Sequence, residues 1–175
     1  GNLDVPLTRK ILSNPEHNIT KHLLYLYSME SFIYGELNRA TRNKDKSKIQ
    51  YYGAYSAALS YIIHSANLNR KDDKKLQGEI TLYRGLKMKK KDYEDYKEKA
   101  NNNEPINLTG YTSTSKDIEV AVRFALNDLT EDKLAVIFVL EFKSQKGLFE
   151  MSKGYTAFPG EDEVLVQDGL QYLIT

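Results

Sequence analysis

Hydrophobic residues in the first half of the chain recur at helical intervals. From about residue 20 to residue 69, apolar and tyrosine side chains return every three or four positions, as on the buried face of an amphipathic helix. One stripe consists of Leu23, Tyr27, Tyr34 and Leu37, and a second consists of Ile49, Tyr52, Tyr55, Leu59, Ile62 and Ala66. Ser47 and Gln50 form a capping-box pattern, so we expect the second helix to begin near Ser47, after a charged turn over residues 42–48.

The second half of the chain changes to the shorter period of β-strands. Extended segments are predicted at residues 80–85, 106–112, 134–142, 148–151, 164–166 and 170–174. The continuous apolar run 134–142 is typical of a buried central strand. A polar helix is predicted at 89–100, and a short helix follows Asp117, its expected N-cap. The order of elements predicts an α+β fold in a single domain, with a helical lobe over about 15–77 and a β-rich core over about 78–175.

Length and composition fit one globular domain. The chain has 175 residues, and 41% of them are hydrophobic, which is enough to form a core without crosslinks. No apolar run approaches the roughly 20 residues that span a bilayer, and the opening residues lack the basic start and apolar run of a signal peptide. We therefore expect no membrane partner for this domain.

Charge and cysteine content exclude several functional classes. There is no cysteine, which excludes thiolate nucleophiles, zinc–thiolate sites and iron–sulfur clusters. The histidines, His17, His22 and His64, form no metal-type pair at helical spacing, so we expect no metal site. The 25 basic residues balance 24 acidic ones, a net charge of +1 that argues against nucleic acid as a partner.

Candidate chemistry lies in three short polar segments at the edges of predicted strands. Arg84 closes a strand and Gly85 follows it, which presents a planar guanidinium suited to pyrophosphate or carboxylate; the alternative is an arginine paired with a surface acid. Residues 110–115 place the three consecutive hydroxyls of Ser113, Thr114 and Ser115 after a glycine, a tyrosine and Thr112. They fit a turn or a helix cap, or hydroxyls that orient a carboxylate and bind a ribose.

The third segment, residues 158–166, carries two glutamates. If it is extended, Glu161 and Glu163 share one face and Asp162 opposes them. Neighbouring carboxylates repel each other unless a cation or a function requires them. A glycosidase pair is disfavoured because its carboxyls must flank the scissile bond. The pair is instead suited to hold a cationic centre beside a cationic acceptor, and a solvated acidic edge is the simpler alternative.

Taken together, the order Arg-Gly, Ser-Thr-Ser and Glu-x-Glu, spaced 29 and 50 residues apart, resembles the R-S-E signature of mono-ADP-ribosyltransferases. The Glu-x-Glu form is similar to the arginine-modifying branch. Residues 27–40 resemble the first helix of the family, residues 121–125 the segment with its aromatic residue, and residues 158–174 the closing strands of actin-modifying binary toxins. The resemblance extends from about residue 20 to the end. Asn127 stands where the actin-modifying toxins carry an arginine.

The resemblance implies a fold and a set of roles. The fold would be a helical lobe packed on a mixed or antiparallel β-sandwich core, and the co-substrate would be NAD, without a metal. Glu163 would stabilise the positive charge on the ribose, Ser113 would hold Glu163, and Glu161 would meet the acceptor. The cofactor-binding residues would be Arg84, Gly85, Leu86, Thr114, Ser115 and Phe124, with Arg84 on the pyrophosphate and Phe124 on the nicotinamide. Phe158 would contact the target protein.

The resemblance also implies the partners and the setting. The acceptor would be an accessible arginine on a target protein, with actin as one candidate, and the chain would be the catalytic domain of a toxin or effector that is secreted or delivered into a target cell and acts in its cytoplasm. Three alternatives remain open. They are an NAD glycohydrolase on the same scaffold, a catalytically silent NAD-binding module, and a tyrosine-rich helical interaction domain in which the three segments coincide by chance.

Overall fold

The structure is a computed structural model that describes residues 15–29, 35–36, 39–40, 46–69, 78–108, 110–151 and 154–174. The elements in chain order are α2 (Pro15–Ser28), α4 (Lys46–Asn69), β1 (Ile80–Lys89), α5 (Lys90–Asn101), β2 (Ile106–Asn107), β3 (Thr112–Ser115), α6 (Ile118–Leu126), β4 (Lys133–Phe142), β5 (Leu148–Glu150), the 3₁₀ turn η2 (Pro159–Glu161), β6 (Glu163–Val166) and β7 (Gln171–Tyr172). The helices α2 and α4 precede the strands, α5 and α6 lie between strands, and the strands pair antiparallel, so the α+β prediction is confirmed.

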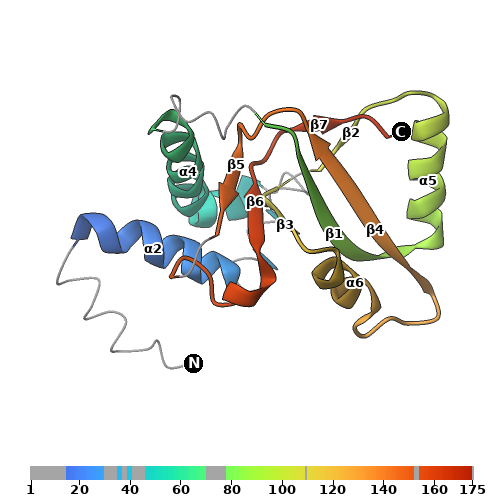
Figure 1. Ribbon diagram of the computed structural model, residues 1–175, viewed down its shortest axis with the longest axis horizontal. Coiled ribbons are helices and arrows are strands. Elements are labelled where there is room, and N and C mark those ends of the chain that lie inside the picture. The colour runs from blue at the N-terminus through green and yellow to red at the C-terminus, as the bar shows by residue number, and fades with distance from the viewer. Residues whose placement is uncertain are drawn as a thin grey trace.

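A five-stranded antiparallel sheet in the order β4-β1-β3-β6-β5 forms the centre of the molecule. Figure 1 shows α2 and α4 together beside the β5 edge and α5 beside the β4 edge. A separate pair, β2 and β7, packs near the main sheet, where the rings of Phe142 and Tyr172 meet edge to face at 6.0 Å. Among the described residues, no helix is long and apolar enough to cross a membrane.

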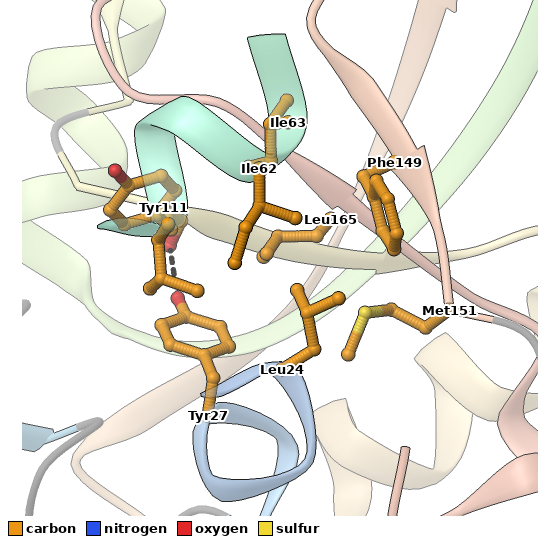
Figure 2. Close-up of a cluster of buried hydrophobic side chains, with 9 residues drawn as sticks. Leu24, Tyr27, Ile62, Ile63, Tyr111, Phe149, Met151 and Leu165 are labelled. Carbon is orange, nitrogen blue, oxygen red and sulfur yellow. Dashed lines mark hydrogen bonds between the residues drawn. The ribbon is translucent and has the colours of Figure 1, made fainter. Parts of the chain in front are cut away.

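The two faces of the β5–β6 pair bury different clusters. Strand alternation directs Phe149 and Leu165 to one face and Leu148, Val164 and Val166 to the other. Figure 2 shows the first cluster, in which side chains of α2 and α4 point toward those of the sheet. Its members are Leu24, Tyr27, Leu59, Ile62, Ile63, Tyr111, Phe149, Met151 and Leu165. This apolar contact holds the amino-terminal helices on the sheet.

Polar contacts fix α2 at the same place. The Tyr27 hydroxyl donates to the backbone oxygen of Tyr111 at 3.1 Å inside the cluster. The backbone N–H of Ala157 donates to the hydroxyl of Ser28 at 2.8 Å, although the two residues are 129 positions apart. The carboxyl end of α2 is therefore tied to the segment that precedes η2.

Several predicted elements occur in the structure. Helix α5 matches the predicted polar helix, and α6 begins after Asp117, whose side chain accepts the N–H of Glu119 at 2.9 Å. The strands β5, β6 and β7 lie within or next to their predicted ranges. Gly169 adopts a φ of 87°, which fits the predicted turn.

The predicted helix limits hold only in part. Helix α4 begins at Lys46, so Ser47 lies in its first turn rather than at the N-cap, and residues 46–48 of the predicted turn are helical. The end of the first stripe, at Tyr34 and Leu37, lies outside the described residues.

Two strand predictions were wrong. Strand β1 does not end at Gly85 but continues to Lys89, because it pairs with β4 over its whole length, from Ile80 opposite Phe142 to Lys89 opposite Lys133. Strand β4 is an edge strand rather than a central one. Its apolar run has another cause: Phe138 packs on Tyr96 of α5, with ring centroids 5.4 Å apart, while alternate residues stay exposed.

The predicted extended segment 106–112 is divided between two sheets. Its first residues form β2, which pairs with β7, whereas Thr112 begins β3 in the main sheet. The positive φ of Gly110, 84°, turns the chain between them. A glycine in this segment was a sequence signal for the break.

Helix α6 packs directly on the backbone of β1 at Gly85. A Cβ added at Gly85 would lie 1.7 Å from the backbone oxygen of Ala121 and 2.9 Å from the backbone nitrogen of Ala125. No side-chain rotation relieves such a clash, because the opposing atoms are helix backbone. Only glycine at this position lets the helix approach so closely.

We expect Gly85→Ala to lower the free energy of unfolding by about 3 kcal/mol or more, because α6 must move away from the sheet. The measurement is urea unfolding followed by circular dichroism. The matched control is Gly160→Ala, where nothing lies within 4 Å of the added Cβ and a change within about 0.5 kcal/mol is expected. Equal stability of the two variants would contradict the packing argument.

Candidate active site

A cavity of about 390 Å³ lies where β1 and β3 separate. The two strands are in register at Tyr83 and Ser115 and diverge beyond this pair. The cavity is lined by Tyr83, Arg84, Gly85, Lys87, Ser113, Thr114, Ser115, Val120, Ala121, Phe124, Asn127, Asp128, Glu161 and Glu163. Its volume is within the range of small-molecule sites, and its walls come from β1, β3, α6 and the η2–β6 segment.

The Arg84 side chain crosses the gap between the two strands. Its Nη1 atom donates to the backbone oxygen of Ser113 at 2.6 Å, which directs the guanidinium along the cavity wall. Among the described residues, none of the ion pairs involves Arg84. Within this part of the chain the arginine lines a cavity and does not pair with a surface acid, which was the alternative that its sequence position left open.

Glu163 presents a buried carboxylate to the cavity. Its residue is 6% exposed, and the Ser113 hydroxyl donates to Oε1 at 2.6 Å. The β3–β6 register places Ser113 opposite Leu165, so Ser113 and Glu163 are diagonal neighbours on paired strands. A short hydrogen bond to an ionised acceptor is among the strong ones, and it fixes this side of the carboxylate.

Glu161 reaches the same cavity from a different backbone element. The prediction of one strand for both glutamates was wrong: Glu161 ends η2, Asp162 has a left-handed φ of 44°, and Glu163 begins β6. The turn at 159–160, a proline and a glycine, keeps the segment from extending. The turn at Asp162, and not strand alternation, brings the two carboxylates into one cavity.

The hydroxyls of the Ser-Thr-Ser segment join the elements around the site. They lie on β3 rather than in a turn. Thr114 Oγ1 donates to the backbone oxygen of Val164 at 2.6 Å, and Ser115 Oγ donates to that of Glu161 at 2.6 Å. Ser115 Oγ also accepts the N–H of Asp117 at 2.9 Å, at the start of α6. One strand thus positions β6, η2 and α6.

Two aromatic side chains flank the glutamates. Phe124 on α6 is 40% exposed and Phe158, which precedes η2, is 44% exposed. Both line a smaller recess beside the cavity, together with Tyr27, Ser28, Ser113, Glu161 and Glu163. Large exposed aromatic rings at a cavity rim are suited to stack on planar groups or to contact a partner.

Two other predicted residues have different surroundings. Gly85 lines the cavity, but the space where a side chain would project is filled by α6, so its lack of a side chain serves the packing of that helix. Leu86 is not among the residues that line the cavity. Its assignment to cofactor binding stays a prediction.

Sequence reasoning missed several residues at the site. Lys87 donates from Nζ to the backbone oxygen of Asn127 at 2.6 Å, so a second cation lines the cavity beside Arg84. Lys87 lies two residues after Gly85 on the same strand, so strand alternation places both residues on one face, and this was the sequence signal that could have identified Lys87. Thr156 was also missed, although its hydroxyl contacts Glu163 at 3.4 Å. No three metal-binding side chains gather among the described residues.

Comparison with known proteins identifies the family. The family model described as NAD:arginine ADP-ribosyltransferase matches residues 9–175. No curated protein matches the chain.

Solved structures share the fold at low sequence identity. HopU1 of Pseudomonas syringae pv. tomato superposes with a TM-score of 0.67 at 14% identity, over 98% of this chain and 76% of that chain. The eukaryotic mono-ADP-ribosyltransferase ART2.2 has a TM-score of 0.62 at 15% identity, over 97% and 68%. The Vis toxin of Vibrio splendidus has a TM-score of 0.54 at 19% identity, over 100% and 80%.

At these identities the superpositions establish the fold alone, which is that of ADP-ribosyltransferases. The family model extends over nearly the whole chain and includes every residue of the cavity. The resemblance found in the sequence is therefore confirmed, and the protein belongs to the NAD:arginine ADP-ribosyltransferase family, whose members are NAD-dependent ADP-ribosyltransferases.

Proposed function

We propose that the protein transfers ADP-ribose from NAD to an arginine side chain of a target protein and releases nicotinamide. The observation that carries this proposal is the buried Glu163 carboxylate, held by Ser113 at 2.6 Å, in the same cavity as Arg84. The cavity offers cationic side chains for a pyrophosphate, a carboxylate for a sugar that becomes positive, and an exposed aromatic ring for a planar base.

Glu163 acts on the sugar. The bond that breaks joins C1′ of the ribose to the nicotinamide nitrogen, and its electron pair leaves with neutral nicotinamide. Positive charge then develops on the ribose, and a preoriented carboxylate in a buried site stabilises it. Ser113 acts through Glu163, because its hydrogen bond keeps the carboxylate in place.

Arg84, Lys87 and Phe124 bind the rest of the co-substrate. The Arg84 guanidinium can form charge-assisted hydrogen bonds to the pyrophosphate, and Lys87 adds a second positive charge on the same strand. Phe124 faces the nicotinamide. Leu86, Thr114 and Ser115 are the other residues predicted to bind NAD. Thr114 and Ser115 act indirectly, because their hydroxyls bond to the backbone of β6 and η2.

Glu161 acts on the acceptor. A guanidinium has a pKa above about 12, so a lone carboxylate does not deprotonate it in the ground state. Glu161 instead holds the arginine over C1′ and takes its proton as the new bond between nitrogen and C1′ forms. Phe158, exposed at the rim, contacts the target protein. Vis in complex with agmatine supports a guanidinium as the acceptor.

The alternatives differ in their acceptor or in their activity. An NAD glycohydrolase would use water in place of the guanidinium and would still need Glu163. A silent NAD-binding module or a helical interaction domain is disfavoured, because Arg84, Ser113, Glu161 and Glu163 line one cavity. The proposed role as a toxin or effector domain in the cytoplasm of a target cell rests on the family resemblance. Actin remains one candidate target.

Arg84→Ala should weaken NAD binding by about 1.5–3 kcal/mol through loss of a charge-assisted bond to the pyrophosphate. Arg84→Lys should restore only part of the affinity, because the planar fork is lost. Isothermal titration with NAD measures both. Lys89→Ala removes a charge from the same strand outside the cavity and should bind like the parent. An Arg84→Ala variant with parental affinity would overturn the assignment of Arg84.

Glu163→Gln should lower both nicotinamide release and acceptor labelling by at least about 100-fold, because the charge it meets develops on the ribose whatever the acceptor is. Glu161→Gln should lose labelling of agmatine and protein arginine but keep NAD binding and much of the NAD hydrolysis.

The two activities are measured in parallel at matched NAD occupancy, so that a general binding defect is excluded. Equal loss of both activities in Glu161→Gln would refute the division of roles between the glutamates. It would also remove the main reason to propose an arginine acceptor.

A further inference from the structure

A buried threonine outside the three signature segments contacts the carboxylate of Glu163. Thr156 lies between β5 and η2 and is 4% exposed. Its hydroxyl donates to Oε2 of Glu163 at 3.4 Å, whereas Ser113 bonds to Oε1 at 2.6 Å. The carboxylate thus receives one hydroxyl on each oxygen, from two different parts of the chain.

The Thr156 hydroxyl has a defined direction. The backbone N–H of Phe158 donates to Thr156 Oγ1 at 3.0 Å. A hydroxyl carries one proton and two acceptor lone pairs, so this bond uses a lone pair and leaves the proton for the glutamate. The threonine is therefore a donor toward Glu163, fixed by the backbone of the residue at the rim of the recess.

A second donor changes what the carboxylate can do. The terminal torsion of a glutamate has a broad, roughly two-fold preference, so a carboxylate held through one oxygen can still turn. A donor on the other oxygen limits that rotation. The segment that carries Thr156 is itself anchored, because the N–H of Ala157 donates to Ser28 of α2 at 2.8 Å.

We propose that Thr156 is a positioning residue that fixes the orientation of the Glu163 carboxylate and links it to the Phe158 segment, where the target protein binds. This inference rests on the proposed function. A small rotation of the carboxylate away from C1′ reduces the stabilisation of the transition state more than it reduces NAD binding. The loss should therefore fall on kcat rather than on KM.

The experiment compares Thr156→Val, Thr156→Ala and Thr156→Ser with the parent. Nicotinamide release is followed without an acceptor and with agmatine, and kcat and KM for NAD are determined separately. We expect Thr156→Val to lower kcat at least about tenfold in both assays with KM within about twofold. Thr156→Ser, which keeps the hydroxyl, should stay within about threefold of the parent.

Thr112→Val is the matched control. It makes the same change at another threonine that is 4% exposed, but that hydroxyl donates to the backbone oxygen of Gly110 and does not line the cavity. Its kcat should stay close to that of the parent. A comparable fall of kcat in this control would show that loss of any buried hydroxyl suffices, and would overturn the proposal.

Other outcomes separate the two levels of inference. If the parent is active and Thr156→Val keeps its kcat, the role of Thr156 is wrong and the proposed function stands. If Thr156→Val fails to fold, the comparison of Thr156→Ser with Thr156→Ala tests the proposal, because these two side chains differ by one oxygen atom. Equal kcat values for these two variants would overturn the proposal. A parent that releases no nicotinamide and labels no acceptor overturns both.

Discussion

The buried carboxylate of Glu163 is the constraint on which the site depends. A charge removed from water is costly unless hydrogen-bond donors replace the solvent. Here one donor comes from β3 and another from the segment before η2. The β3–β6 pairing must therefore hold its register, because a slip of one residue would turn Ser113 to the opposite face of the sheet. The apolar cluster around Leu165 secures that register on the same face of β6, because Leu165 lies two residues after Glu163 and opposite Ser113.

Sequence patterns predicted which helices and strands form better than they predicted which of these elements lie next to each other. The periodicity around Leu59 predicted α4, and the N-cap residue Asp117 predicted the start of α6. Each signal depends only on residues within one helix, so the local sequence was sufficient to find it. The position of β4 was not predictable, because an apolar run shows that a strand is covered but not by which element. A helix, α5, covers Phe138, whereas the prediction required strands on both sides. Strand partners depend on long-range pairing that a local pattern does not encode.

The site was predictable as a set of residues but not as a geometry. Arg84, Ser113 and Glu163 stand out in the sequence because residue types and spacing resemble a known signature, and the fold brings them to one cavity. The left-handed turn at Asp162 was hidden, since an aspartate between two glutamates also fits a strand. Thr156 could not be predicted for another reason. The sequence around a threonine in a loop does not show whether its hydroxyl caps the local backbone or donates to a buried carboxylate.

The separation of the two glutamates between a strand and a 3₁₀ turn has a mechanical consequence. Glu163 starts β6, an interior strand that is hydrogen-bonded to β3 on one side and to β5 on the other. Glu161 is held at its backbone oxygen by Ser115, on a turn whose other end is the exposed Phe158. Under the proposed function, the carboxylate that meets the sugar starts a strand paired on both sides, and the carboxylate that meets the acceptor lies on a three-residue turn. Because Ser113 and Ser115 are two residues apart on β3, one strand holds both the carboxylate of Glu163 and the backbone of Glu161.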